Sequence, residues 1–338
     1  MRCTVLDFIC EQLRELPVPA TVEACAGRTF IVTGSNSGIG FETAKHLVQL
    51  QAAKVILAVR NTKAGERARA DIEAATAAHD SSRKGVAEVW PLDLANYASV
   101  RAFARRATAD LERIDGLIES AAISLDRWLV AEGSEISVTV NVFSTMLLAV
   151  LLLPKMTATG RRFNIVPRLV FVTSSLAFRE RDRFQKIEAD VWDSLSDRKS
   201  KLGNRYGITK LLHLYAAFHF ATLAPPSRTG VIVNYTNPGL CKSGLVRHCK
   251  LSTRIQVEVM RAILGRTSEM GSRTVLYAMV AGLSSHGQYL SDCKNKNYQV
   301  PSWITDSKGK RMQKDIWDGI VEKLEMIEPG CVRKALEC

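Results

Sequence analysis

Hydrophobic residues alternate along this chain between short apolar runs and longer stretches with helical spacing. The short runs predict strands at residues 28–33, 54–59, 87–91, 116–119, 168–173 and 230–235. The spacing between them predicts helices over 38–50, 64–78, 98–111, 135–153 and 206–223, with Asn96 capping the third. This alternation predicts a parallel sheet covered on both faces, which binds ligands at the carboxyl ends of its strands.

The fold class that follows is α/β, a single doubly wound Rossmann-type domain at residues 28–292 with a parallel sheet of about seven strands. No linker or internal repeat divides this stretch. Residues 293–338 form a C-terminal helical extension, and residues 1–27 form an N-terminal one. In the latter, one helical face carries five apolar residues: Val5, Phe8, Ile9, Leu13 and Leu16. This helix could pack on the body, cover a substrate or lie on a membrane surface.

The composition is that of an ordinary globular protein. The 338 residues are 46% hydrophobic, which is enough for a sizeable core. Lys and Arg number 46 against 34 Asp and Glu, for a net charge of +12. Because the basic residues are dispersed and lack interleaved aromatic residues, we expect no nucleic-acid partner. We assign the charge to solvated surface and to a phosphate-bearing cofactor.

Cysteine spacing and the length of the apolar runs bear on location. The eight Cys include no C-x-x-C pair and no metal-ligand spacing, which predicts reduced thiols and no metal site. No signal peptide is expected because Asp7, Glu11 and Glu15 interrupt the first apolar stretch. The longest apolar run, 146–154, is too short to span a bilayer. We therefore expect a cytoplasmic protein without an integral membrane span.

A glycine-rich turn, Gly34-Ser-Asn-Ser-Gly38-Ile-Gly40, follows the first predicted strand and precedes a predicted helix. Glycines let the backbone approach a ligand, and the first N–H groups of a helix face an anion, so this order indicates a dinucleotide pyrophosphate site. Arg60 directly follows the second predicted strand, at the position where an Asp or Glu would bind an adenosine 2′-hydroxyl. This favours NADP over NAD, unless Arg60 merely begins a solvated helix.

Tyr206 and Lys210 stand four residues apart at the start of the predicted helix 206–223, so they share a face. The ammonium favours the phenolate, and a Tyr whose pKa falls below about 10 can exchange protons with a substrate oxygen near neutral pH. The spacing arises by chance in many helices, so its weight comes from the glycine turn upstream.

These motifs, in this order, resemble the short-chain dehydrogenase/reductase superfamily over nearly the whole chain. The resemblance rests on residues 33–40, Asp93-Leu94, Asn141, Ser174-Ser175, Tyr206-x-x-x-Lys210 and Pro238-Gly239. Residues 58–61, 237–240 and 287–292 are similar to retinol-dehydrogenase-like and WW-domain-oxidoreductase-like members. The N-terminal helix and the Trp-rich tail are similar to dehydrogenases of fungal secondary-metabolite pathways, including terpenoid and polyketide ones.

The resemblance implies a catalytic group made of Asn141, Ser175, Tyr206 and Lys210. Ser175 would hydrogen-bond the substrate oxygen, with Ser174 as the alternative, while Tyr206 gives or takes the proton. Lys210 would lower the Tyr206 pKa and hold the nicotinamide ribose. Asn141 would hold a water that links Lys210 to bulk solvent.

The resemblance also implies the contacts to NADP(H). Arg60 would face the 2′-phosphate, Asp93 and Leu94 the adenine, and Pro238, Gly239 and Ser243 the nicotinamide carboxamide. Tyr206 and Lys210 would also contact the cofactor. The remaining contacts lie in the pyrophosphate loop and after the fourth strand: Gly34, Ser35, Ser37, Gly38, Ile39, Gly40, Ser120 and Ala121.

One stretch departs from the family pattern. Where the family has Asn-Asn-Ala-Gly after the fourth strand, this chain has Glu119-Ser-Ala-Ala-Ile123. Ser120 could replace only part of the bonding of the usual amide. The change therefore bears on cofactor affinity more than on chemistry.

Two segments point to a large substrate. The insert at 178–204 could wall a pocket with its apolar residues Phe184, Ile187, Val191, Trp192 and Leu195, or it could be a surface excursion. Residues 240–264 lie where the family places its mobile substrate lid. An enlarged site would suit a bulky, largely apolar alcohol or ketone.

We therefore expect an NADP-dependent oxidoreductase that interconverts a secondary alcohol and a ketone. The rival interpretations are an isomerase, epimerase or dehydratase on the same scaffold, and a non-catalytic NADP-binding protein. Helices 135–153 and 206–223 are apolar around much of their circumference, and in relatives they often form a dimer interface. A homodimer through them is possible unless the terminal extensions cover them.

Overall fold

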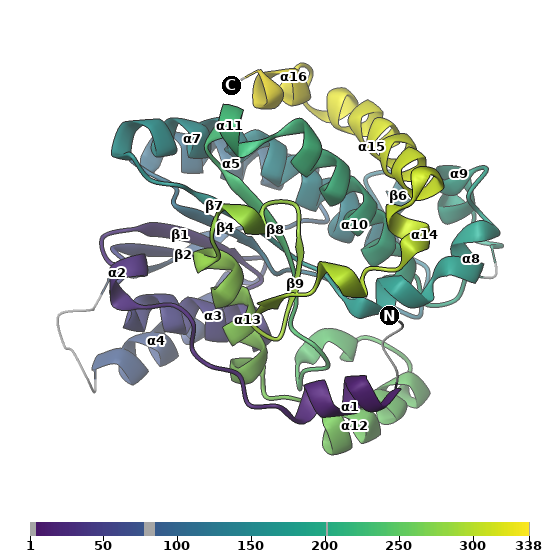
Figure 1. The fold of residues 1–338 in the computed structure, drawn as a ribbon, viewed down its shortest axis with the longest axis horizontal. Coiled ribbons are helices and arrows are strands. Elements are labelled where there is room, and N and C mark those ends of the chain that lie inside the picture. Colours follow the sequence, from purple (N-terminus) through teal and green to yellow (C-terminus); the bar gives the residue numbers. More distant parts are fainter. Residues whose placement is uncertain (1–4, 78–84, 201, 338) are drawn as a thin grey trace.

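A twisted sheet with helices on both faces forms the centre of the molecule (Figure 1). In this computed structural model, the described residues are 5–77, 85–200 and 202–337. Eight strands of this part of the chain join in the order β10-β9-β8-β7-β4-β1-β2-β3, and every neighbouring pair is parallel except β10 with β9. The strands are β1 (Thr29–Thr33), β2 (Lys54–Val59), β3 (Ala87–Pro91), β4 (Gly116–Glu119), β7 (Arg168–Val172), β8 (Ile232–Asn237), β9 (Tyr289–Ser291) and β10 (Lys294–Asn295).

Helices cover both faces of this sheet. One face carries α3 (Gly38–Gln49), α4 (Thr62–Ala77) and α13 (Ser268–Val280). The other carries α5 (Tyr97–Asp110), α7 (Thr145–Phe163) and α10 (Tyr206–Leu223). The expected doubly wound α/β fold is thus confirmed. The chain adds strands outward from β1 to β3 and then returns to place β4 on the other side of β1. The order in which strands are added therefore reverses between β1 and β4, and such folds bind ligands at this point.

The predicted strands agree closely with the observed ones, and the largest shift is at β8, which begins and ends two residues later than expected. Asn96 caps α5 as expected, because its side chain accepts a hydrogen bond from the backbone N–H of Ser99. The predicted end of the second helix, Ala78, lies outside the described residues. Residues 289–295 add two strands that the hydrophobic pattern did not indicate, and β5 (Val130–Ala131) and β6 (Ser134–Glu135) form a separate hairpin.

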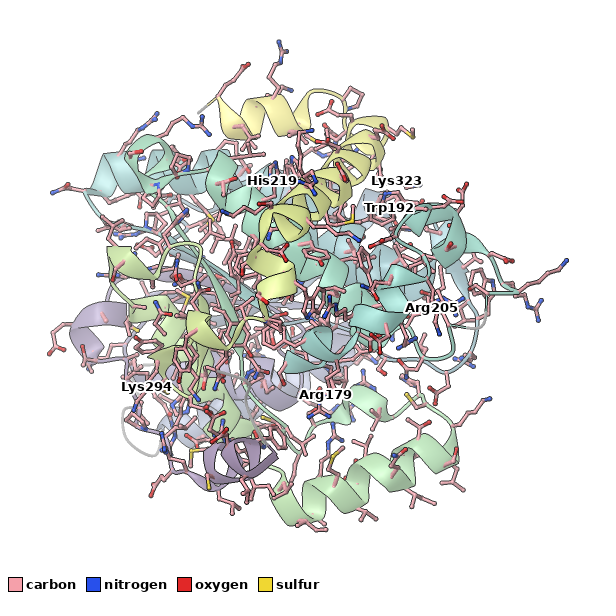
Figure 2. The ribbon with its side chains drawn as sticks, turned by 45° about the vertical axis from the view of Figure 1, so that its right-hand side comes forward. Arg179, Trp192, Arg205, His219, Lys294 and Lys323 are labelled. Carbon is pink, nitrogen blue, oxygen red and sulfur yellow. The ribbon has the colours of Figure 1, made fainter. Side chains whose placement is uncertain are left out.

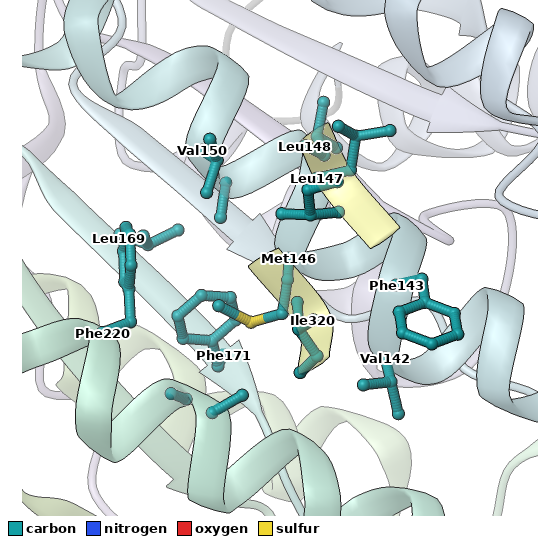
Figure 3. Packing of buried hydrophobic residues seen from close by; sticks show 14 of the residues in the cluster. Val142, Phe143, Met146, Leu147, Leu148, Val150, Leu169, Phe171, Phe220 and Ile320 are labelled. Atoms are coloured by element: carbon teal, nitrogen blue, oxygen red, sulfur yellow. The ribbon is translucent and has the colours of Figure 1, made fainter. Parts of the chain in front are cut away.

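The predicted helix 135–153 is longer than expected and contains a π-helical turn. It comprises α6 (Ile136–Val138), the π-helix η2 (Thr139–Ser144) and α7. By length and composition the run 136–163 could cross a membrane, but 89% of its most apolar window is buried inside the structure, as in the core helix of a soluble fold. Figure 3 shows its side chains, such as Phe143 and Met146, packed among residues of β7, α10 and the C-terminal segment.

The C-terminal segment completes this packing. It contains α14 (Ser302–Thr305), α15 (Ser307–Ile327) and α16 (Cys331–Leu336). Helix α15 lies along α10, and α16 lies against α7 (Figure 1). Residues such as Ile320 and Leu324 are fully buried in the core that they share. The C-terminal extension therefore covers part of the apolar circumference of the two helices expected at a dimer interface, which is the alternative that the sequence left open.

The N-terminal helix α1 (Val5–Leu13) lies at the far end of the molecule beside α12 (Leu251–Leu264), as Figure 1 shows. A short α2 (Val22–Cys25) then leads into β1. The insert after β7 forms the 3-10 turn η3 (Ser175–Arg179), α8 (Arg181–Gln185) and α9 (Val191–Ser196), and α11 (Pro226–Thr229) precedes β8.

Candidate active site

A cavity of about 770 Å³ opens at the carboxyl ends of the central strands. Each strand that reaches it contributes a lining residue just beyond its end. These residues are Gly34 after β1, Arg60 after β2, Asp93 after β3, Ser120 after β4, Ser174 after β7 and Pro238 after β8. The size is at the upper end of the range usual for ligand sites.

The glycine turn has the geometry that a pyrophosphate site requires. Gly34 adopts a φ of +66°, and a Cβ there would lie 2.9 Å from the Cα of Ala121. A Cβ on Gly40 would lie 2.9 Å from the carbonyl oxygen of Gly34. Only glycine fits at either position without a shift of the backbone. The first residues of α3, Gly38, Ile39 and Gly40, line the cavity, as a helix N-terminus that binds a pyrophosphate requires.

Almost all of the predicted cofactor residues line this cavity. The exception is Ser35, which is fully buried and whose hydroxyl donates a hydrogen bond to the carbonyl oxygen of Val32, 2.9 Å away. Its side chain therefore stabilises the turn, and a cofactor contact of Ser35 would have to come from its backbone. The residues that do line the cavity are Gly34, Ser37, Gly38, Ile39, Gly40, Arg60, Asp93, Leu94, Ser120, Ala121, Pro238, Gly239 and Ser243.

Positive charge gathers at the end of the cavity where Arg60 lies. Arg60 is exposed, and within the described residues it has no carboxylate partner within 4 Å. Arg247 lines the same cavity. Burial is the main cause that lowers the pKa of His248, and the charges of Arg247 and Arg60 lower it further, so both guanidinium groups lie near that ring. The sequence motifs did not indicate Arg247. Two guanidinium groups without an acidic neighbour fit a phosphate group such as the 2′-phosphate of NADP.

Tyr206 is the first residue of α10 and is held there by its neighbours. Its backbone N–H donates to Asn204 Oδ1 at 2.9 Å, and the amide nitrogen of Asn204 donates to Ser124 Oγ at 3.1 Å. One turn further along, Lys210 Nζ donates to the carbonyl oxygen of Val172, 2.8 Å away, and lies 5.9 Å from the centroid of the Tyr206 ring. Tyr206 and Lys210 therefore both reach the cavity, as the spacing predicted, while the role of Asn204 escaped the sequence motifs.

The electrostatics of Tyr206 differ from the sequence expectation. Burial raises the pKa of its phenol to about 12, although a hydrogen bond with Ser174 and the charge of Arg261 lower it. Lys210 is not among the groups that lower this pKa. Burial also lowers the pKa of Lys210 to about 8. Burial thus outweighs the Ser174 hydrogen bond and the Arg261 charge, and the expected shift of the Tyr206 pKa below 10 is wrong.

The two adjacent serines take different positions in the structure. Both line the cavity, but the side chain that hydrogen-bonds the Tyr206 phenol is that of Ser174. Ser174 also caps η3, because its hydroxyl accepts a hydrogen bond from the N–H of Leu176. Ser175, which the family pattern favours, begins η3 at the cavity wall. Both hydroxyls are therefore available to hold a substrate oxygen beside Tyr206.

Asn141 lies behind the cavity wall, in the π-helical turn. Its amide exchanges two hydrogen bonds of 2.9 Å with the backbone of Ile123 and donates a third, of 3.0 Å, to Thr209 Oγ1. Thr209 precedes Lys210 on α10. The Asn141 side chain therefore connects the loop after β4 to the helix that carries Tyr206 and Lys210. Because its amide oxygen and nitrogen are already hydrogen-bonded, the expected water would have to be held by other atoms of this turn.

The departure at Glu119 has a structural consequence. Its carboxyl group is buried, and neither oxygen has a hydrogen-bond partner within 3.5 Å in the described part of the chain. Burial raises its pKa well above the usual value, while the charge of Lys210 and, more weakly, the hydroxyl of Thr33 oppose that shift. His213, one turn beyond Lys210, is also buried without partners for its ring nitrogens. Lys210 is thus surrounded by buried titratable groups.

The insert between the serines and Tyr206 does not wall the cavity as expected. Phe184, Ile187, Val191 and Leu195 are buried in the main core, and the Trp192 ring packs on that of Phe143, with 5.0 Å between centroids. Figure 2 shows Trp192 beside the yellow C-terminal helices and Arg179 lower down, above the light green α12. What the insert presents to the cavity is polar: Arg179, Glu180, Arg183 and Asn204.

The apolar wall comes instead from α12, the preceding loop and α1. The segment expected to be a lid contributes Leu245, Val246, Val257, Met260 and Leu264, and α1 contributes Phe8 and Ile9. Arg261, on the same inner face of α12, is 3% exposed and donates to the carbonyl oxygen of Ser243 at 2.7 Å and to its hydroxyl at 3.2 Å. This bond ties α12 to the loop predicted to contact nicotinamide. No sequence motif indicated Arg261.

Comparison with known proteins agrees with this geometry. Residues 28–185 match the family model described as short chain dehydrogenase. The chain is 39% identical over 332 residues to the short chain dehydrogenase/reductase dmxR8 of Cryptosporiopsis sp. (strain 8999), across 96% of this chain and 98% of that protein. It is 38% identical over 300 residues to the short chain dehydrogenase atnD of Emericella nidulans, across 86% and 91% of the two chains. The chain therefore belongs to the short-chain dehydrogenase/reductase family of oxidoreductases.

Solved structures share the fold. The Pseudomonas aeruginosa RhlG/NADP active-site complex superposes with a TM-score of 0.58 at 21% identity, over 79% of this chain and 94% of that chain. A 3-oxoacyl (acyl-carrier-protein) reductase from Agrobacterium tumefaciens with NADP bound gives a TM-score of 0.59 at 20% identity, over 79% and 93%. At such identities the likeness concerns the fold.

Proposed function

We propose that this protein is an NADP(H)-dependent oxidoreductase that interconverts a secondary alcohol and a ketone on a bulky, largely apolar substrate. The observation that carries the proposal is the convergence of Tyr206, Lys210 and two serine hydroxyls on the same cavity as the glycine turn. A proton-transfer group and a nucleotide cradle in one cavity suit hydride chemistry.

The residues divide the chemical work as follows. A nicotinamide, when bound, supplies or accepts the hydride. Ser174 and Ser175 hold the substrate oxygen, and Tyr206 gives that oxygen a proton in reduction or removes it in oxidation. Lys210, whose pKa burial lowers to about 8, would hold the cofactor ribose beside Tyr206. Asn141 fixes the helix that carries both residues.

The preference for NADP rests on charge. Arg60 and Arg247 face the cavity where the adenosine end of a cofactor would lie, and Arg60 has no acidic partner among the described residues. A 2′-phosphate gains two guanidinium contacts there, whereas NAD leaves both guanidinium groups without an anion. The NADP-bound relatives of the same fold support this preference.

The substrate class follows from the apolar side of the cavity. Leu245, Val257, Met260 and Leu264, with Phe8 from α1, offer hydrophobic surface and few hydrogen-bond partners. Such a wall favours a large hydrophobic ring system over a small polar alcohol. With the fungal short-chain dehydrogenases to which the chain is similar, this wall is consistent with a terpenoid or polyketide intermediate of secondary metabolism as substrate. We expect the enzyme to act in the cytoplasm.

The decisive experiment is incubation of the purified protein and NADPH or NADP with a panel of bulky cyclic ketones and alcohols. Cofactor absorbance and product mass are followed together. The proposal expects a mass change of two hydrogens, with one equivalent of cofactor consumed per product. A product of unchanged mass, or a loss of water without net cofactor consumption, would instead identify the protein as an isomerase, epimerase or dehydratase.

One observation favours a second candidate, a non-catalytic NADP-binding protein. Among the described residues the buried carboxyl of Glu119 has no hydrogen-bond partner, and it stands near Lys210 where the family pattern has an amide. Stabilisation of the protein by NADPH in a thermal-shift assay, together with inactivity on the whole panel, would favour this candidate over the enzyme.

A further inference from the structure

An exposed apolar surface lies on the outer side of α1 and α12. In α12 it consists of residues spaced four apart, Leu251, Ile255, Val259 and Ile263, which are 56–70% exposed. In α1 it consists of Leu6 and Leu13, which are 72% and 67% exposed. The two helices lie side by side at one end of the molecule (Figure 1). We call these six residues the α1–α12 surface.

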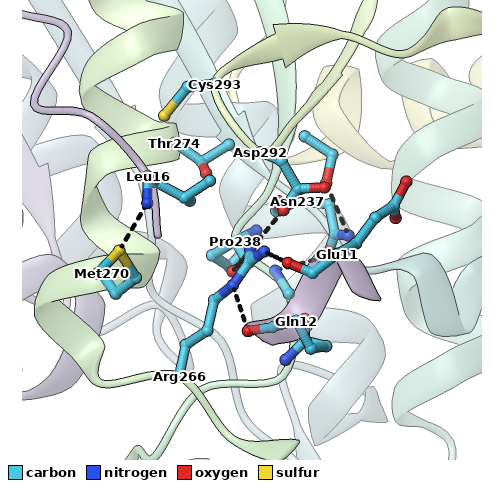
Figure 4. A network of polar contacts seen from close by, with 12 residues as sticks. Glu11, Gln12, Leu16, Asn237, Pro238, Arg266, Met270, Thr274, Asp292 and Cys293 are labelled. Atoms are coloured by element: carbon cyan, nitrogen blue, oxygen red, sulfur yellow. Dashed lines mark hydrogen bonds and ion pairs between the residues drawn. The ribbon is translucent and has the colours of Figure 1, made fainter. Parts of the chain in front are cut away.

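This surface is held on a fixed base. Gln12 at the end of α1 donates from its amide to the carbonyl oxygens of Leu240 and Leu264, both at 3.0 Å. Arg266 donates to the carbonyl oxygen of Gln12 and forms a buried ion pair with Asp292 at 2.5 Å (Figure 4). Buried polar groups joined this way are costly to separate. The exposed leucines of α1 are therefore presented by an anchored helix.

The inner faces of the same two helices line the substrate side of the cavity. Phe8 and Ile9 of α1, and Val257, Met260 and Leu264 of α12, point inward. None of the six residues of the α1–α12 surface lines the cavity. The two helices thus form a wall one helix thick, with a substrate cavity on one side and an apolar exterior on the other.

The charge around α12 is strongly positive. Residues 242–266 contain six Lys or Arg and one Glu. Lys250 directly precedes α12 and Arg254 lies on it, and both are exposed. Lys242 and Arg247 are exposed in the loop before α12, where Arg247 also lines the cavity. Acidic residues occur on the α1 side, at Asp7 and Glu15, so the positive charge is concentrated at α12. An apolar helical stripe bordered by basic residues is the pattern of a helix that lies in the surface of an anionic membrane.

We propose that the α1–α12 surface docks the protein on an anionic phospholipid membrane, with α12 lying in the interface. Docking would put the cavity wall against the phase in which a large apolar substrate dissolves, and this part of the inference rests on the proposed function. A second copy of the chain fits less well. In a two-fold symmetric contact, the basic residues beside one α12 would face those of the other.

The test uses the full chain and sedimentation with phospholipid vesicles. One set of vesicles is phosphatidylcholine, and in the other about a third of the lipid is phosphatidylserine. The protein is compared with the triple variant Ile255→Gln, Val259→Gln, Ile263→Gln. The matched control is the double variant Leu283→Gln, Met326→Gln, which removes apolar residues that are 64% and 77% exposed elsewhere on the surface.

We expect the wild type and the control to sediment with the phosphatidylserine vesicles, and the triple variant to bind them at least tenfold more weakly. Binding to neutral vesicles should be weaker for all three. Equal binding by the triple variant, or a wild type that stays in the supernatant, would overturn the proposal. So would light scattering that finds a wild-type dimer dissociated by the triple substitution, because the surface would then be a subunit interface.

Two readouts keep these outcomes interpretable. Melting temperature and NADPH affinity should match the wild type in both variants, because none of the substituted residues is buried or lines the cavity. The sedimentation assay needs no turnover. A protein that binds vesicles but reduces no ketone contradicts only the proposed function, and one that reduces ketones but ignores vesicles contradicts only the membrane proposal.

Discussion

The cofactor side and the substrate side of the cavity are built in different ways. On the cofactor side, the ends of β1, β2 and β3 carry short motifs whose side chains and backbone face the cavity directly. On the substrate side, the wall comes from α1, α12 and the loop before α12, which are far apart in the sequence. There the lining residues follow from how helices pack, and a motif search finds few of them.

The contrast shows what a sequence motif can and cannot determine. Gly34 and Gly40 are required by backbone contacts within a few residues, so the pattern alone locates their function. Phe184 and Met260 are both apolar residues in segments expected near the substrate, yet the first is in the core and the second lines the cavity. Packing between segments far apart in the sequence determines which of the two residues lines the cavity.

The contrast between core and cavity wall is tested most strongly by replacing each of those two residues with Ala. Phe184→Ala should lower the free energy of unfolding by about 3–5 kcal/mol, because Phe184 is 2% exposed and packs on Tyr215. Met260→Ala, the matched variant at the cavity wall, should change stability by less than about 1 kcal/mol and alter the apparent KM for apolar substrates. Urea unfolding and steady-state kinetics measure both. A KM effect confined to Phe184→Ala would contradict the assignment of the two walls.

On the cofactor side, Gly40→Ala should weaken NADPH binding by about a hundredfold, since the added Cβ would meet the Gly34 carbonyl at 2.9 Å and push the loop outward. Gly282→Ala is the control, because a Cβ there meets nothing within 4 Å. Fluorescence titration with NADPH gives the affinities. Unchanged affinity in Gly40→Ala would show that the turn does not cradle the cofactor.

Lys210 lies between the cofactor side and the substrate side of the cavity. Lys210→Met should raise the free energy of unfolding of the cofactor-free protein at pH 7 by about 2 kcal/mol. Burial lowers the Lys210 pKa from 10.5 to about 8, so the folded state bears a desolvated charge below pH 8. Between pH 8 and 10.5 the unfolded chain binds more protons than the folded one, so wild-type stability rises and the advantage of Met shrinks.

Urea unfolding at pH 7 and pH 10 measures this difference. The control is Lys294→Met, at an exposed lysine on the edge strand β10 (Figure 2). An advantage of Lys210→Met that grows with pH would contradict the buried ammonium.

The smallest expected effect is in cofactor choice. Arg60→Asp should lower the preference for NADPH over NADH by about tenfold, because it removes a guanidinium from the proposed phosphate site and places a like charge there. The exposed Arg105, remote from the cavity, supplies the control Arg105→Asp. The ratio of kcat/KM for the two cofactors is the measurement. An unchanged ratio would assign the phosphate to other residues, such as Arg247.

Much of the fold could be predicted from the sequence because parallel strands that are buried on both faces leave short, clearly bounded apolar runs. The strands at β2, β3 and β4 begin and end as predicted. The pattern failed at 289–295, where two short strands pair at the edge of the sheet, and in the insert, whose apolar residues serve the core.

The candidate site was predictable where one residue type performs the chemistry at a fixed spacing. Tyr206 and Lys210 are such a pair. The spacing does not reveal that the Ser35 hydroxyl donates a hydrogen bond to the carbonyl oxygen of Val32. The predicted downward shift of the Tyr206 pKa was wrong, because burial of the phenol raises its pKa and the extent of burial depends on the packing around it. Arg247 and Arg261 belong to no motif, and they line the cavity because of how α12 and the loop before it pack on the rest of the fold.

The central claim is that Tyr206 exchanges the proton beside a bound nicotinamide, and Tyr206→Phe tests it most directly. NADPH affinity and turnover of an active ketone from the panel are measured on the same preparation. The claim predicts an affinity within about threefold of the wild type and a turnover at least about a hundredfold lower. A variant that binds NADPH normally and turns over at the wild-type rate would contradict it.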